Sequence, residues 1–142
     1  MKLRYIISKI IDWLKSPQVF GSKKKMIPGR WQLFEYYLDL DKELLHFEEP
    51  FLKENKVLLV FSFLENHELI LAGNPPVELL KNFTEGKWSV ARNYITFIEP
   101  KNFRNNIEFQ YAFEKGNLKL LKKDAMGNIE FFGFFKRVKA VN

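Results

Sequence analysis

Few side chains in this sequence are suited to catalysis, and they are spread along the chain. There are two histidines, His46 and His67, and no cysteine. The lack of cysteine excludes disulfides and thiolate chemistry. The two histidines do not have the paired spacing of a metal site, where several ligands must converge on one ion. We therefore expect both to face solvent from loops, and we expect neither a metal nor a cofactor.

The other candidate groups also lack catalytic neighbours. Ser62 lies in the segment FSFLE, without the glycines that flank a nucleophile elbow. Glu48 and Glu49 are adjacent in a predicted loop, where carboxylates are usually solvated. No glycine-rich phosphate-binding loop is present. The sequence therefore predicts no catalytic residue, and we expect the protein not to be an enzyme.

One carboxylate, Glu35, lies in the aromatic segment WQLFEYYL. If Trp31 faces the interior of a sheet structure, alternation predicts that Leu33, Glu35 and Tyr37 face it too. Inside, Glu35 could hold the polar group of a ligand or act as an acid. Alternatively it lies near a rim or pairs with an arginine, because buried carboxylates are usually paired.

Composition favours one globular domain with a thick aromatic core. The chain has 142 residues, of which 46% are hydrophobic and 28% charged. Fifteen Phe, five Tyr and three Trp are present. Because aromatic side chains bury large areas, they suit either a thick core or an apolar ligand cavity.

All of the net charge of +6 lies near the N-terminus. Residues 1–25 contain one acidic residue, Asp12, and these basic residues: Lys2, Arg4, Lys9, Lys15, Lys23, Lys24 and Lys25. The rest of the chain is electrically balanced. This asymmetry predicts a separate unit at residues 1–27, made of a basic amphipathic helix and a linker, before a body at residues 28–142.

The first sixteen residues have helical periodicity, and Ser16-Pro17 should end the helix. Their apolar side chains cover an arc of roughly 160° at 100° per residue. The members of this arc are Leu3, Ile6, Ile7, Ile10, Ile11, Trp13 and Leu14.

Several roles can be compared for this helix. Lys9 and Asp12 interrupt the apolar region that a secretion signal needs, and no small-residue cleavage site follows. The segment is shorter than the roughly 20 apolar residues of a membrane span. Two roles stay open: residues 1–25 could lie on an anionic membrane surface, or the helix could dock on the body and close one end of it. We favour docking. Nucleic-acid binding is not expected, since the basic residues are not interleaved with aromatics along a face.

The sequence of residues 28–142 predicts a β-structure with about eight strands and no crossover helices. Two long connections interrupt it, 39–55 with a helical turn before Pro50, and 73–85 with a short helix from Pro76. Short strands joined by short turns favour an all-β, eight-stranded, antiparallel up-and-down barrel. The expected strands are 31–38, 56–65, 67–73, 87–91, 94–99, 106–114, 117–123 and 129–138.

Gly29, Trp31 and Arg137, together with the meander of strands, resemble the lipocalins, or calycins. The resemblance covers about residues 28–139 and is closer to the small bacterial lipocalin-like domains than to the long secreted carriers. It implies that Trp31 packs at the closed end of a barrel with Arg137 over it. Fatty-acid-binding proteins, with ten strands and a helical lid, are a related alternative with more strands than we count.

Barrel closure by the first and last strands predicts a register. An antiparallel pair would place Trp31 near Arg137, where a cation–π contact can form. The same register would place Leu33 near Phe135, Glu35 near Gly133, and Tyr37 near Phe131.

The leading hypothesis is non-enzymatic binding of a small hydrophobic or amphipathic ligand inside the barrel. The alternative is a module that contacts a protein or membrane surface through the N-terminal helix. We expect a cytoplasmic protein, and the N-terminal helix would allow peripheral contact with a membrane. The sequence leaves the oligomeric state open. The expected ligand-binding residues are Glu35, Tyr37, Phe61, Phe63, Trp88, Phe109, Tyr111 and Phe131.

Overall fold

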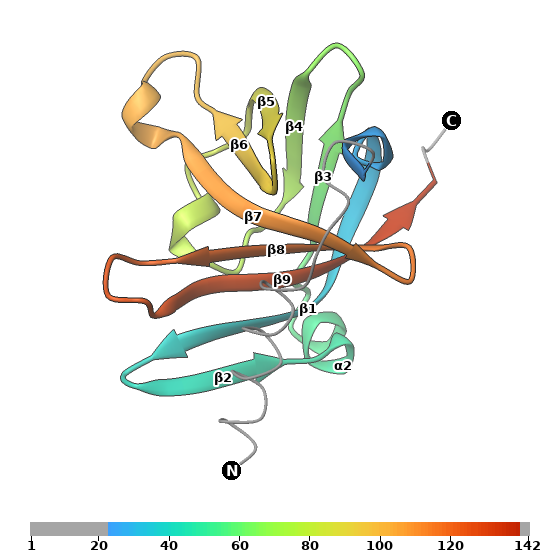
Figure 1. The fold of residues 1–142 in the computed structure, drawn as a ribbon. Helices are drawn as coiled ribbons and strands as arrows, with labels where there is room; N and C mark the ends of the chain where they lie inside the picture. Colours follow the sequence, from blue (N-terminus) through green and yellow to red (C-terminus); the bar gives the residue numbers. More distant parts are fainter. Residues whose placement is uncertain (1–22, 140–142) are drawn as a thin grey trace.

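The computed structural model describes residues 23–139, and β-strands make up most of this part of the chain (Figure 1). One α-helix, α2 (Glu49–Glu54), and three 3-10 helices, η1 (Lys23–Met26), η2 (Glu78–Leu80) and η3 (Phe103–Asn105), lie outside the strands. The strands are β1 (Gly29–Leu40), β2 (Glu43–Phe47), β3 (Leu59–Phe63), β4 (Glu68–Gly73), β5 (Glu85–Ala91), β6 (Tyr94–Ile98), β7 (Ile107–Glu114), β8 (Asn117–Lys123) and β9 (Ile129–Val138).

Eight of these strands close into an antiparallel up-and-down barrel. Neighbours pair in the order β1-β3-β4-β5-β6-β7-β8-β9, and β9 pairs back onto β1. This confirms the predicted architecture. Because β1 has neighbours on both sides, it leaves no free edge along the stretch that β9 and β3 share.

The strand β2 lies beside the barrel proper, and the sequence analysis missed it. β1 is long: Gly29–Gln32 pairs with β3, whereas Tyr36–Leu40 pairs with β2. The turn between β1 and β2 is Asp41-Lys42, and both residues have positive φ, 52° and 66°. A two-residue turn of this kind usually contains glycine or asparagine, so Asp-Lys gave little signal.

The predicted loop 39–55 therefore contains a strand and a helix. Pro50 lies in the first turn of α2, where its missing N–H costs nothing, rather than after a helical turn. In the second long connection, η2 follows Pro76 as expected.

A β-bulge changes the predicted register halfway along β1. Trp31 pairs with Arg137 and Leu33 pairs with Phe135, which confirms the first half of the prediction. The register then shifts between Leu33 and Glu35. Beyond the shift, the predicted partners of Glu35 and Tyr37 are wrong: Glu35 lies opposite Phe134 and Tyr37 opposite Phe132.

The bulge exchanges the two faces of β1. Tyr36, 4% exposed, joins the main core beside Leu33. Consecutive residues of a strand point to opposite faces, so Glu35 and Tyr37 lie on the outer side. The expectation that these two side chains face the interior is wrong for this reason.

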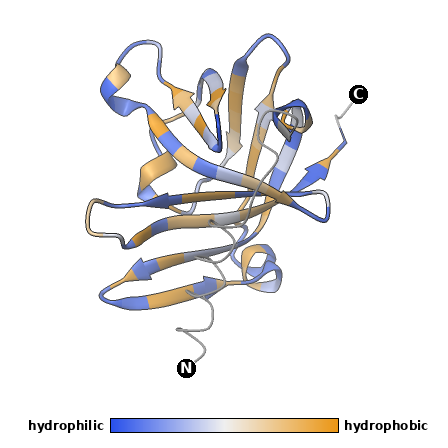
Figure 2. Cartoon of the chain, in the orientation of Figure 1, coloured by the Kyte–Doolittle hydropathy of each residue, from blue (hydrophilic) through white to orange (hydrophobic). Residues whose placement is uncertain are grey.

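Hydrophobic side chains fill the barrel and cover its two ends. The strands alternate hydrophobic and hydrophilic residues, while the loops are mostly hydrophilic (Figure 2). At one end Ile27 is fully buried beneath η1, and at the other Leu52 of α2 and Leu80 of η2 join the same core. Each such side chain contributes roughly 1.5–3 kcal/mol by leaving water.

Residues 1–22 and 140–142 lie outside the described residues. The predicted N-terminal helix and most of the predicted 1–27 unit therefore fall outside them as well. Within residues 23–139, no helix combines the length and the apolar character that crossing a membrane would require.

Candidate functional site

The barrel closes where Trp31 and Arg137 meet. The guanidinium carbon of Arg137 lies 4.3 Å from the centroid of the Trp31 ring. Arg137 Nη1 donates to the carbonyl of Pro28 at 2.9 Å, and Nη2 donates to that of Met26 at 2.5 Å. The Trp31 indole N–H donates to the carbonyl of Ile27 at 2.8 Å. These contacts tie the segment before β1 to the end of β9.

Gly29 allows this arrangement. Its φ is +134°, which L side chains rarely adopt, and a Cβ there would collide with Arg137 Nη1. All three residues expected at the closure therefore lie together.

Six of the expected ligand-binding residues lie in the interior. Their side chains are at most 5% exposed and belong to one core cluster. These residues are Phe61, Phe63, Trp88, Phe109, Tyr111 and Phe131.

The aromatic rings of the interior touch one another. The ring of Phe97 lies 5.0 Å from that of Phe61 and 5.0 Å from that of Phe109, and the rings of Phe61 and Phe135 are 4.9 Å apart. Rings at these spacings are in contact, so no ligand fits between them. Phe97 and Phe135 were missed as wall residues, although the alternation in YITFI and the predicted register of Phe135 both point inward.

The other two expected residues, Glu35 and Tyr37, form a polar group on the outer side with His46. Glu35 Oε2 lies 2.5 Å from His46 Nε2, and Glu48 lies 3.9 Å from His46 Nδ1. The His46 ring stacks on that of Tyr37, with centroids 4.1 Å apart. His46 thus belongs to β2, not to a loop as expected.

Burial and two carboxylates act on Tyr37. Partial burial raises its pKa most, and the negative charges of Glu35 and Glu48 raise it further, to about 12. A phenol held in its neutral form at ordinary pH is a poor base. The Glu35–His46–Tyr37 group is a surface hydrogen bond with a stacked ring, and it lines neither of the two hollows described next.

A hollow of about 400 Å³ lies at the closed end of the barrel, beside Trp88. Two contacts fix the Trp88 side chain. Its indole N–H donates to the carbonyl of Leu64 at 3.0 Å, and the His67 ring stacks on the indole with centroids 4.6 Å apart. His67 therefore packs on an aromatic ring, in addition to lying in a loop as expected. The hollow is lined by Lys24, Lys25, Pro28, Glu65, His67, Trp88 and Val90.

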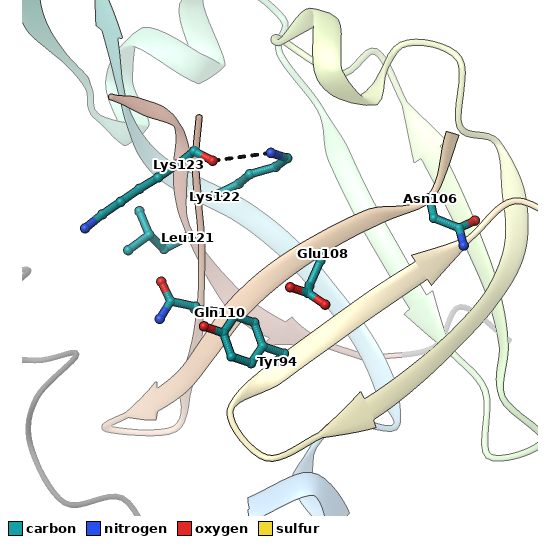
Figure 3. Close-up of a pocket in the computed structure, with 7 residues that line it drawn as sticks. All are labelled: Tyr94, Asn106, Glu108, Gln110, Leu121, Lys122 and Lys123. Atoms are coloured by element: carbon teal, nitrogen blue, oxygen red, sulfur yellow. Dashed lines mark hydrogen bonds between the residues drawn. The ribbon is translucent and has the colours of Figure 1, made fainter. Parts of the chain in front are cut away.

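A second hollow, of about 360 Å³, opens on the side of the barrel (Figure 3). The first half of β7, Ile107–Gln110, pairs with β6, whereas only the second half, Gln110–Glu114, pairs with β8. The hollow forms because β7 and β8 separate on the N-terminal side of Gln110. Its lining is mostly polar, and the ammonium group of Lys122 is held by Glu130 at 3.3 Å. Neither hollow was predicted, because each is lined by segments that are far apart in the sequence.

Among residues 23–139, no three His, Asp or Glu side chains converge as metal ligands would. No protein-family model matches the chain, and no curated protein matches it. The closed, eight-stranded antiparallel barrel is compatible with a calycin-type fold.

Proposed function

We propose that this protein is a non-enzymatic, lipocalin-like binding protein whose ligand is a small amphipathic anion. The observation that carries the proposal is the hollow beside Trp88, which combines an apolar floor with two lysines. Because the interior rings are in contact, the ligand lies at the end of the barrel rather than at its centre.

The lining residues offer two kinds of contact, so the ligand should have an apolar part and an anionic part. Trp88, Val90 and Pro28 offer an apolar surface to a short alkyl or aryl group. The exposed Lys24 and Lys25 offer ammonium groups to a carboxylate or sulfonate. A volume of about 400 Å³ falls at the small end of the usual range for ligand pockets, roughly 300–1,000 Å³. A medium-chain carboxylate meets these requirements.

The position of Glu35 supports binding without catalysis. The one carboxylate that the sequence placed in the interior lies on the outer side, paired with His46. The aromatic interior contains no buried polar or charged residue among residues 23–139. A general acid has no place there, so the proposal assigns no catalytic step to the barrel.

Fluorescent-dye titration tests the proposal. The probe is anilinonaphthalene sulfonate, an aromatic anion, and the competitor is dodecanoate. We expect saturable binding of one dye per chain, a change in Trp88 emission, and displacement by dodecanoate. Lys24→Glu with Lys25→Glu should weaken binding about tenfold, because each exposed charge pair contributes roughly 0.2–1 kcal/mol and reversal adds repulsion.

The matched control reverses two exposed lysines elsewhere, Lys56→Glu with Lys101→Glu. It has the same net charge as the test variant, so equal weakening in both would assign the effect to overall charge. That result, or dye binding that never saturates, would overturn the proposal.

A further inference from the structure

The outer side of the barrel carries an apolar surface where β1, β8 and β9 run side by side. Strand pairing sets His46, Tyr37, Phe132, Leu121 and Gln110 in one row across five strands. Tyr37, Leu44 and Phe134 pack against the buried members of this surface. We call it the outer apolar face; its members are Tyr37, Leu44, Ala112, Leu121, Ile129, Phe132 and Phe134.

This face is shielded from water although it points away from the core. Leu121 is 1% exposed, Phe132 4% and Ala112 5%. Some other outward side chains of the same barrel are more open to solvent, as in Ile70 of β4, which is 46% exposed. A sheet face made of aliphatic and aromatic side chains is a surface on which the apolar side of an amphipathic element can pack.

The helices of residues 23–139 do not supply this cover. Leu52 of α2 and Leu80 of η2 belong to the interior core, at the end of the barrel. In Figure 1 these helices lie around the margin of the barrel, and none is drawn across β8 and β9. These helices are therefore not candidates for packing on this face.

We propose that residues 3–14 cover the outer apolar face as an amphipathic helix. The apolar arc of this segment, with its isoleucines and Trp13, matches a surface made of aliphatic and aromatic side chains. Sequence reasoning expected this helix to close one end of the body. The apolar character of the outer face favours a position along the side of the barrel.

The length and entry point of the chain fit this position. Met26 is hydrogen-bonded to Arg137, so the described chain begins beside the β1–β9 pair. Residues 15–22 can span up to about 26 Å from there, and a twelve-residue helix is about 18 Å long. Ten residues of β9 extend about 33 Å, so the helix fits along the face.

Charge favours the same arrangement. Residues 1–25 carry the whole net charge of +6. Four carboxylates flank the outer apolar face, Glu35 and Asp39 from β1 and Glu108 and Glu114 from β7. Lys119, which pairs with Glu114 and lies over the Phe134 ring, is a cation on the same face. Basic residues at the edges of the helix would meet these carboxylates while its apolar arc is buried.

Hydrogen exchange of the full chain, read by mass spectrometry, tests the proposal. A free segment of about twelve residues is a marginal helix in water, so slow exchange at residues 3–14 requires packing. We expect slow exchange in the native sequence and at least tenfold faster exchange at residues 3–14 after Leu121→Asp. The control Ile70→Asp places the same charge on an open outward position and should leave residues 3–14 protected.

The same experiment separates release of the helix from unfolding, because it also reports the barrel amides. If Leu121→Asp speeds exchange throughout the barrel, the variant Ile10→Asp becomes the deciding measurement, because it places the charge on the N-terminal segment and not in the barrel. It should speed exchange at residues 3–14 with the barrel unchanged. Fast exchange in the native chain, or no effect of Ile10→Asp, would overturn the proposal.

Other occupants would give different results. Protection of residues 3–14 that develops only with phosphatidylglycerol vesicles would assign the helix to a membrane surface. Protection of the outer apolar face only at concentrations where light scattering shows a dimer would assign it to a second copy. Each of these outcomes contradicts docking within one chain.

Discussion

Tyr37 shows how neighbours set the chemistry of a single side chain in this protein. It stacks on His46, lies partly buried, and sits near the carboxylates of Glu35 and Glu48. Burial first, and then the two carboxylates, oppose a negative charge on the phenol, which explains why its pKa is raised from 10.0 to about 12. One residue earlier, Tyr36 has its own pKa raised by burial in the core.

The raised pKa of Tyr37 makes stability depend on pH in the alkaline range. The unfolded chain loses the phenol proton near pH 10, whereas the folded chain keeps it until about pH 12. The contribution is therefore fully present below pH 10 and is lost as pH rises to about 12. Urea unfolding at a series of pH values should show a shallower alkaline loss in Tyr37→Phe than in the native chain. Identical slopes would mean that Tyr37 titrates normally.

At the scale of elements, β1 and β9 determine how the barrel closes. The bulge in β1 turns Tyr36 inward, and Tyr36 lies directly opposite Gly133 of β9. Phe131, Gly133 and Phe135 alternate along the inner side of β9, so the glycine leaves room for the two rings. A Cβ at Gly133 would overlap the Phe131 ring and come within 2.9 Å of the Phe135 ring.

Gly133→Ala should therefore destabilise the protein. Adding a methyl group to a filled core forces neighbouring rings from their rotamers, at a cost of about 1–3 kcal/mol. The control is Gly116→Asn, at a hairpin turn where an added Cβ meets nothing within 4 Å and asparagine tolerates the positive φ. Urea unfolding should show a smaller loss of stability for the control, because it strains the backbone without overlapping a neighbouring side chain. Equal midpoints for the two variants would contradict tight packing around Gly133.

For the whole molecule, the main consequence is a barrel filled by its own side chains. Eight strands give an interior just wide enough either to be filled or to hold one small ligand. Here Phe97 has four ring partners, at 5.0–5.8 Å, from β3, β7 and the segment after η2. The interior is therefore a core, and the ligand is proposed to bind at the end of the barrel.

Removing the central ring tests this description. Phe97→Ala should cost about 3–5 kcal/mol, since it deletes a buried ring and leaves a cavity. An apolar cavity of this kind stays dry and accepts a small aromatic molecule. Benzene should then raise the melting temperature of Phe97→Ala but not that of the native chain. Benzene stabilisation of the native chain would show that an open interior cavity already exists.

Sequence patterns predicted the elements that depend on local rules. Alternation in segments such as NIEFQYAFE identified strands, and Lys115-Gly116 identified a hairpin turn. The pairing of Trp31 with Arg137 followed from closing an antiparallel meander. β2 was missed because the second residue of its turn, Lys42, is of a type that seldom adopts positive φ.

By itself, then, the sequence determined the strand content, the closed barrel and its closure residues, because period-2 alternation and turn chemistry are local. The tertiary structure decided which way Glu35 and Tyr37 point, since a one-residue bulge depends on how β1 fits β9. It also decided that the rings fill the interior and that apolar side chains gather on the outer side of β1, β8 and β9. Both depend on distances between strands that are far apart along the chain.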